Sequence, residues 1–151
     1  MKKVALIVAG GKGERMNADI PKQFLLLNNL PILMHTIKQF SHFEEIVLVL
    51  PKSQFDYWNG LCKNNNFNQI HILVEGGETR FHSVKNGLDK IDNTSVVAIH
   101  DGVRPLISTA LINNLVAETK SGIGVIPIIP VKNSIRKIEG ENSVHIDRSN
   151  L

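Results

Sequence analysis

Short apolar runs recur along the chain and are separated by more polar segments. The runs cover residues 3–8, 46–50, 70–74, 96–99 and 123–129. They are rich in valine and isoleucine and show no alternation with polar residues, which is typical of strands covered on both faces of a sheet. We therefore expect each run to form a buried strand.

Several segments between these runs have the spacing of amphipathic helices. Apolar residues recur at intervals of three and four over residues 32–40, 81–91 and 111–116. Thr79 and Ser108 precede the second and third of these segments and are suitable N-caps. Strands that alternate with helices predict an α/β fold, with a three-layer, Rossmann-like and mostly parallel sheet joined by right-handed crossovers.

Composition limits the class of protein. A chain of 151 residues with 42% hydrophobic and 21% charged residues predicts one ordinary globular domain over residues 1–151. The apolar runs are too short for a membrane span. A net charge of +3 without a long basic run argues against a nucleic-acid partner. Cys62 is the single cysteine, so an intramolecular disulfide is impossible and a cytoplasmic location is favoured.

A glycine-rich loop follows the first apolar run. Three glycines occupy four successive positions, and three basic residues lie in the loop or soon after it: Gly10, Gly11, Gly13, Lys12, Arg15 and Lys22. Glycines let the backbone aim successive N–H groups into one concavity, which can bind phosphate oxygens. The added positive charge suits a triphosphate. The alternative is a simple tight turn between a strand and a helix.

Two well-known phosphate loops do not fit this sequence. A Walker A loop has Ser or Thr directly after its Gly-Lys pair, whereas Gly13 follows Lys12 here. The dinucleotide fingerprint has a third glycine where this chain has Met16, and its second strand ends in an acid where this chain has Pro51.

Two further clusters follow later strands. Gly76 and Gly77 precede a capped helix whose first turn contains Ser83, so free N–H groups and a hydroxyl facing the loop are expected. Asp101 and Arg104 follow the fourth strand, at the carboxyl end where open α/β sheets bind ligands. The alternatives are a glycine turn with an N-cap and a surface ion pair.

These motifs, in this order, resemble one enzyme family. Ile-Val-Ala-Gly-Gly-Lys-Gly-Glu-Arg-Met followed by Pro-Lys-Gln-Phe resembles the CTP-binding signature of 2-C-methyl-D-erythritol 4-phosphate cytidylyltransferases, of the nucleotide-diphosphosugar transferase type. Ribitol-5-phosphate cytidylyltransferases share that signature. Gly-Gly-Glu-Thr-Arg-Phe-His-Ser and His-Asp-Gly-Val-Arg-Pro are also similar, although Gly102 stands where the family has Ala, a change expected to be harmless, and Asn133 stands where it has an acid.

The resemblance implies a function in isoprenoid precursor synthesis. A phosphate oxygen of methylerythritol phosphate would attack the α-phosphorus of CTP in line and expel pyrophosphate. Arg15 and Lys22 would stabilise the charge at the α-phosphate. Mg²⁺ would be the cofactor and would be held mainly by the CTP phosphates, without a confident protein ligand. The family further implies a homodimer for the full-length chain.

The resemblance also implies the binding residues. The nucleotide-binding set comprises Ala9, Gly10, Gly11, Lys12, Gly13, Gly77, Glu78, Arg80, Ser83, Asp101 and Gly102. The acceptor-binding set comprises Arg104, Ser134 and Arg148. The six histidines lack metal-ligand spacing, His100 is expected to be structural, and neither Tyr57 nor Trp58 needs a functional role.

Two alternatives to the main hypothesis stay open at this point. Ribitol 5-phosphate could be the acceptor, or the chain could bind CTP without activity. Chains of the family run well beyond this length, so the C-terminal part of the family fold is expected to be missing. We then expect CTP binding with poor turnover and an ill-packed last strand.

Overall fold

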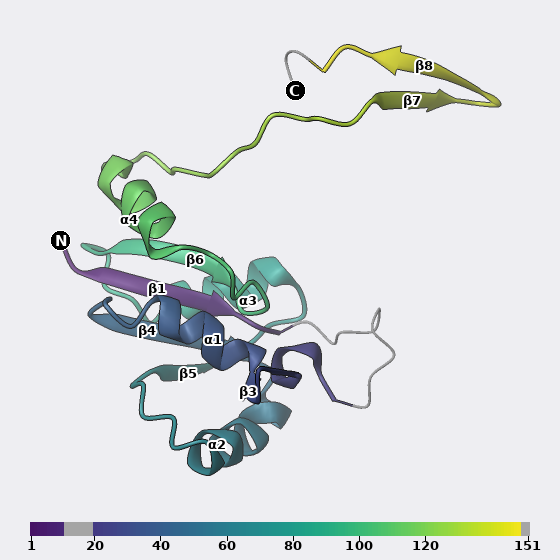
Figure 1. The fold of residues 1–151 in the computed structure, drawn as a ribbon. Helices are drawn as coiled ribbons and strands as arrows, with labels where there is room; N and C mark the ends of the chain where they lie inside the picture. Colours follow the sequence, from purple (N-terminus) through teal and green to yellow (C-terminus); the bar gives the residue numbers. More distant parts are fainter. Residues whose placement is uncertain (11–19, 149–151) are drawn as a thin grey trace. The chain divides into compact units, whose positions relative to one another are not determined.

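The computed structural model describes residues 1–10 and 20–148 (Figure 1). It divides the chain into two compact units, Met1–Thr119 and Lys120–Leu151. Each unit is described by itself below. The single domain expected over residues 1–151 stays a prediction.

A four-stranded parallel sheet forms the centre of the first unit. Its strands are β1 (Lys3–Val8), β4 (Glu45–Leu50), β5 (Ile72–Glu75) and β6 (Val96–Asp101), in the order β5-β4-β1-β6. They confirm four of the five strands that the apolar runs predicted. The run at 70–74 begins its strand two residues later than expected, because Ile70 lies outside the ladder and is exposed.

Helices cover both faces of this sheet. One face of β1 and β4 packs with residues of α1 (Ile32–Gln39), α2 (Phe55–Asn64) and α4 (Thr109–Glu118). The alternate side chains of the same strands point to the other face, where α3 (Arg80–Leu88) packs on β1, β4 and β5. The predicted three-layer α/β architecture is therefore confirmed, and the inner strands are apolar throughout because both of their faces are covered.

The predicted N-caps are also confirmed. The Thr79 hydroxyl accepts a hydrogen bond from the backbone N–H of His82 at 3.3 Å, and the Ser108 hydroxyl accepts one from Leu111 at 3.2 Å. Each bond satisfies one of the N–H groups that a helix leaves free at its start. The two caps fix where α3 and α4 begin, directly after the loops that follow β5 and β6.

Helix α2 was not predicted from the sequence. Its polar residues and Gly60 weaken the helical pattern of the segment that contains Tyr57 and Trp58. Trp58 is in fact completely buried and lies against the rings of Phe24 and Phe67. Helix α2 therefore belongs to the core.

Short elements connect the large ones. The 3₁₀ helices are η2 (Lys22–Phe24) and η3 (Lys52–Gln54). Strands β2 (Leu26–Leu27) and β3 (Leu30–Pro31) form a small antiparallel ribbon. Its turn is made by Asn28 and Asn29, which both have positive φ as a two-residue hairpin turn requires.

The second unit contains an antiparallel hairpin of β7 (Ile135–Glu139) and β8 (Asn142–Ile146). The strand predicted over 123–129 is wrong. Only an isolated bridge between Lys120 and Ile123 is present among the described residues there, and the side chains of Ile126, Ile128 and Ile129 are 78–88% exposed. A strand requires a neighbouring strand to accept and donate its backbone hydrogen bonds, and an apolar run alone does not provide one.

Among the described helices, none has the length and apolar character needed to cross a bilayer.

The pairing of Trp58 with His71 predicts a dependence of stability on pH. The indole N–H of Trp58 donates to Nε2 of His71 at 2.8 Å, and the ring Nδ1 of His71 lies 2.8 Å from the carbonyl oxygen of Gln69. A neutral ring that donates from Nδ1 and accepts at Nε2 satisfies both contacts. Burial lowers the pKa of His71 despite the opposing effect of the Gln69 carbonyl.

The unfolded chain therefore takes up this proton first, and the free energy of unfolding should decrease as pH falls below about 6.5. Urea titrations between pH 8 and pH 5 measure this decrease. The His71→Gln variant should show a flatter profile. An unchanged slope in that variant would assign the dependence to other groups.

Candidate active site

Three loops meet the sheet at the carboxyl ends of its strands. Their first backbone N–H groups extend the parallel ladders: Ala9 donates to Val49 O at 2.9 Å, Gly76 to Leu50 O at 2.9 Å, and Gly102 to Val8 O at 2.8 Å. The start of the glycine-rich loop and the two later clusters are thereby fixed along one edge of the sheet. This is the edge at which open α/β sheets bind ligands.

Ser83 lies between the first two of these loops. A Cβ added to Gly10 or to Gly76 would come within 3.6 Å and 3.2 Å of the Ser83 hydroxyl oxygen. That hydroxyl is buried, accepts a hydrogen bond from the Gly77 N–H at 3.0 Å and can donate to the Gly77 carbonyl at 3.4 Å. Ser83 therefore faces the loop, as its position in the first turn of α3 predicted, and it holds the backbone at Gly77.

The fit at Gly77 requires glycine. An added Cβ would lie 2.4 Å from the Cβ of His82. This separation is far below any tolerated contact, so a side chain at 77 would push the loop away from α3. The glycine pair thus permits the close approach that brings the 76–77 backbone within reach of Ser83.

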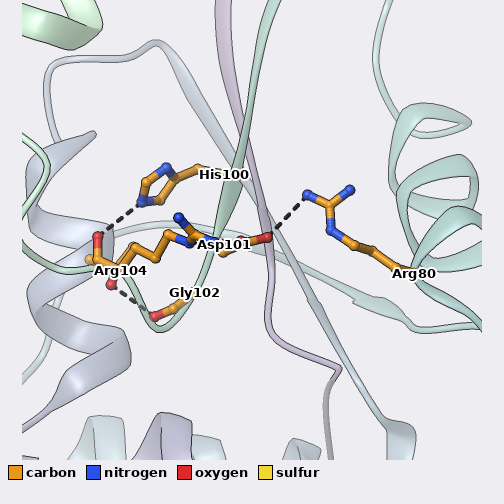
Figure 2. A network of polar contacts seen from close by, with 6 residues as sticks. Arg80, His100, Asp101, Gly102 and Arg104 are labelled. Atoms are coloured by element: carbon orange, nitrogen blue, oxygen red, sulfur yellow. Dashed lines mark hydrogen bonds and ion pairs between the residues drawn. The ribbon is translucent and has the colours of Figure 1, made fainter. Parts of the chain in front are cut away.

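Asp101 joins the second loop to the third (Figure 2). Its Oδ1 accepts a hydrogen bond from Nη2 of Arg80 at 3.0 Å, and its Oδ2 pairs with Nε of Arg104 at 2.9 Å. Partial burial raises the pKa of Asp101, but the hydrogen bond and charge of Arg80, together with the charges of Arg104 and His100, outweigh burial and lower it overall. The carboxylate is therefore ionised at neutral pH. Because two guanidinium groups surround one carboxylate, the cluster keeps an excess positive charge that favours an anion.

The backbone of Gly102 is held on two sides. Its N–H donates to the carbonyl of Val8, and its own carbonyl accepts a hydrogen bond from the Thr36 hydroxyl at 2.8 Å. A Cβ at this position would lie 2.7 Å from the Cβ of Ala9. The N–H is thus already used by the sheet, and the backbone is adapted to glycine at the position where the resembled family has Ala.

His100 supports the same loop from the other side. Its Nε2 lies 3.0 Å from the backbone carbonyl oxygen of Arg104 (Figure 2). Its ring centroid lies 5.2 Å from that of Phe40. These contacts are those of a residue that shapes the turn, which agrees with the structural role expected for it.

Lys22 is positioned by its neighbour Gln23. The side chain of Gln23 is only 1% exposed, and its Nε2 donates both to the Ala9 carbonyl at 3.0 Å and to Oε1 of Gln54 at 2.8 Å. The turn that carries Lys22 is therefore tied to the start of the glycine-rich loop. Sequence reasoning quoted Gln23 only as part of a motif and missed Gln54, for which the sequence contains no signal.

The remaining candidate residues are not connected to this cluster by hydrogen bonds in the described part of the chain. Gly11, Lys12, Gly13 and Arg15 lie outside the described residues. Glu78 is exposed near the start of α3. Ser134 and Arg148 belong to the second unit, where Nη1 of Arg148 donates to the carbonyl of Lys132. Within residues 1–10 and 20–148, no group of three or more His, Cys, Asp or Glu side chains is arranged to hold a metal ion.

Glycine-lined turns and arginines at the carboxyl edge of a parallel α/β sheet define a nucleotide-binding protein that handles phosphate groups. The profile of the family described as IspD, 2-C-methyl-D-erythritol 4-phosphate cytidylyltransferase, matches residues 3–151. The chain belongs to this family of cytidylyltransferase enzymes.

Individual relatives agree with this assignment. The protein of that name from Azobacteroides pseudotrichonymphae is 48% identical over 151 residues, which cover 98% of this chain and 68% of the relative. Its counterpart from Bacteroides fragilis is 45% identical over 99% of this chain and 69% of the relative. The chain thus spans about two thirds of the length of these relatives.

A solved structure shares the fold. The crystal structure of 2-C-methyl-D-erythritol 4-phosphate cytidylyltransferase from Thermus thermophilus matches 98% of this chain and 64% of its own chain, with a TM-score of 0.74 and 27% identity. The similarity includes the mostly parallel sheet expected from the sequence.

The contacts of Ser83 predict the effect of removing its hydroxyl. The Ser83→Ala variant leaves the Gly77 N–H without its acceptor, so the free energy of unfolding should fall by about 1–2 kcal/mol. Urea denaturation measures the loss, and Ser41→Ala, at an exposed position, is the matched control. Wild-type stability in the Ser83 variant would mean that the loop does not depend on this hydroxyl.

Proposed function

We propose that the chain transfers CMP from CTP to 2-C-methyl-D-erythritol 4-phosphate and releases pyrophosphate, a step of isoprenoid precursor synthesis. The observation that carries this proposal is that three of the family's motifs begin along one edge of the sheet, at Ala9, Gly76 and Gly102. The relatives are named for the methylerythritol substrate, which supports that acceptor rather than ribitol 5-phosphate.

The reaction exchanges one bond at phosphorus for another. An oxygen of the acceptor phosphate bonds to the α-phosphorus of CTP, while the bond from that phosphorus to the bridging oxygen breaks and pyrophosphate leaves with the electron pair. An ionised phosphate needs no base to attack, so positioning and charge neutralisation dominate the catalysis. Lys22 and Arg15 supply that neutralisation in the proposal, with Lys22 carried by the turn that Gln23 ties to Ala9.

The residues present fit a nucleotide with Mg²⁺ bound mainly through its phosphates. Asp101 is a carboxylate at this edge, and both of its oxygens are engaged by Arg80 and Arg104. Protein ligation of the ion is therefore secondary in the proposal, and the CTP phosphates provide most of its oxygen ligands. Bound in this way, Mg²⁺ reduces the repulsion between the two anionic substrates.

The acceptor phosphate is assigned to Arg104, and the family resemblance further implies Ser134 and Arg148 as acceptor-binding residues. The side chain of Arg104 is 74% exposed, so its guanidinium can bind an incoming anion while Asp101 holds its Nε. A homodimer and a cytoplasmic location complete the proposal. The location is supported by Cys62, the single cysteine, because a chain without an intramolecular disulfide suits a reducing compartment.

A pyrophosphate-release assay tests the proposed reaction. The protein is incubated with CTP and Mg²⁺, and with methylerythritol phosphate, ribitol 5-phosphate or no acceptor. We expect slow release, above the background only with methylerythritol phosphate, because the chain spans about two thirds of the length of its relatives. Preference for ribitol 5-phosphate would correct the acceptor. CTP binding without release would contradict the proposed activity of this chain.

The same assignment predicts a nucleotide preference. Hydrogen bonds from the 76–83 segment to the cytosine ring should make CTP bind at least about tenfold more tightly than UTP, ATP or GTP, or about 1.4 kcal/mol. Isothermal titration calorimetry on the chain measures this ratio without requiring turnover. Equal affinity for the four nucleotides would remove cytosine recognition from this segment.

Lys22→Ala separates catalysis from binding. Loss of one preorganised positive charge at the α-phosphate should lower turnover by roughly 10²–10³, measured in a full-length version if this chain alone is inactive. The affinity for CTP should fall much less, and Arg15→Ala should behave in the same way. Lys38→Ala, at an exposed position on α1, is the control. Near-normal turnover in the Lys22 variant would exclude this role for Lys22.

A further inference from the structure

Gln54, which lies outside all the sequence motifs, supports the turn that carries Lys22 through a hydrogen bond with Gln23. Gln23 has two amide hydrogens on Nε2, and both are used: one by the Ala9 carbonyl at 3.0 Å and one by Oε1 of Gln54 at 2.8 Å. The Gln23 side chain is almost completely buried, so water does not compensate for a lost partner.

The Ala9 carbonyl determines which end of the Gln23 amide faces it, and Gln54 accepts the second hydrogen of that amide. A buried amide can present its NH₂ group or its oxygen, and only NH₂ matches the Ala9 carbonyl. Oε1 of Gln54 pairs the second amide hydrogen and ties the Gln23 side chain to the segment before α2. Without Gln54, one hydrogen of an almost completely buried amide would be unpaired and this tie would be lost.

The position of Gln54 is fixed by its backbone. It ends η3, directly before α2, and its own N–H donates to Pro51 O at 2.9 Å. Helix α2 also contacts the next residue of the turn, since the ring of Phe24 lies 5.1 Å from that of Tyr57 and 6.2 Å from that of Trp58. The turn is therefore held to α2 at two adjacent residues.

Ala9, at the other end of these hydrogen bonds, is also held on two sides. Ala9 donates its N–H to Val49 O at 2.9 Å while its carbonyl accepts from Gln23. Ala9 is the residue from which the glycine-rich loop begins. The chain of contacts thus runs from α2 through Gln54 and Gln23 to the start of that loop.

We propose that Gln54 is a positioning residue for the triphosphate: acting through Gln23, it sets the place of Lys22 relative to the start of the glycine-rich loop. This inference rests on the proposed function, because it assigns the triphosphate to these two elements. It concerns only the phosphate side of the nucleotide. The cytosine side is assigned to the loop at Gly77, which Ser83 holds independently.

The test compares two ligands in one variant. Gln54→Met keeps the length of the side chain and removes its acceptor. CTP affinity should fall about three- to tenfold, the range expected for one lost buried hydrogen bond, while cytidine affinity should change by less than about twofold. Calorimetry measures CTP binding in Mg²⁺, and nuclear magnetic resonance titration measures the weaker binding of cytidine. Gln39→Met, the same substitution on α1, is the control.

A double-mutant cycle tests whether Gln54 acts through Gln23. In a Gln23→Met background, Gln54→Met should have no further effect on CTP affinity, because the intermediate has already been removed. Additive losses would contradict the proposed route. If Gln54→Met does not fold, Gln54→Ala removes the same acceptor and gives the same comparison.

The outcomes separate this inference from the proposed function. If the unmodified chain fails to bind CTP, the proposed function is wrong and the inference is lost with it. If the unmodified chain binds CTP but Gln54→Met binds it equally well, the inference alone is wrong. A parallel loss of CTP and cytidine affinity would show a general structural role and would also overturn it.

Discussion

Strand β1 pairs with parallel strands on both sides, with β4 through Val4–Val8 and with β6 through Lys3–Val8. This double pairing, together with the parallel pairing of β5 on β4, places the loops after β1, β5 and β6 at one edge of the sheet. Hydrogen bonding continues past the strands, since Ala9 is bonded to β4 and Gly102 to β1. The loops therefore begin in fixed register, and their first residues cannot shift without breaking the ladder from which they extend.

Side chains from the helices then hold each of these loops in place. Ser83 of α3 holds Gly77, Thr36 of α1 holds Gly102, and Gln23 joins Ala9 to Gln54. All of these bonds involve polar groups that are at least partly buried, where an unpaired group is costly. The candidate site is thus supported by a shell of uncharged hydrogen bonds, and the charged residues Arg80, Asp101 and Arg104 lie outside that shell with greater exposure.

The sequence predicted those parts of the molecule that local patterns determine. Neighbouring residues are enough to predict buried strands, capped helices and the order of the glycine-rich motifs. The position of Ser83 in the first turn of α3 follows from the same local information. Helix α2 escaped prediction because its helical form depends on burying Trp58 against Phe24 and Phe67, which lie outside the helix. The strand predicted over 123–129 was wrong for a related reason, because a strand forms only when a second strand pairs with it. Gln54 could not be found because its role depends entirely on Gln23, 31 residues away.

The pairing of Asp101 with two arginines has a consequence for the entropy of ligand binding. Arginine side chains are long, and immobilising one on a ligand costs conformational freedom. Arg80 and Arg104 are already oriented by the same carboxylate, which also reduces the repulsion between their guanidinium groups. Much of the ordering therefore occurs during folding. An anion that reaches this edge meets two cations whose arrangement has been set in advance, so more of the electrostatic attraction remains as affinity.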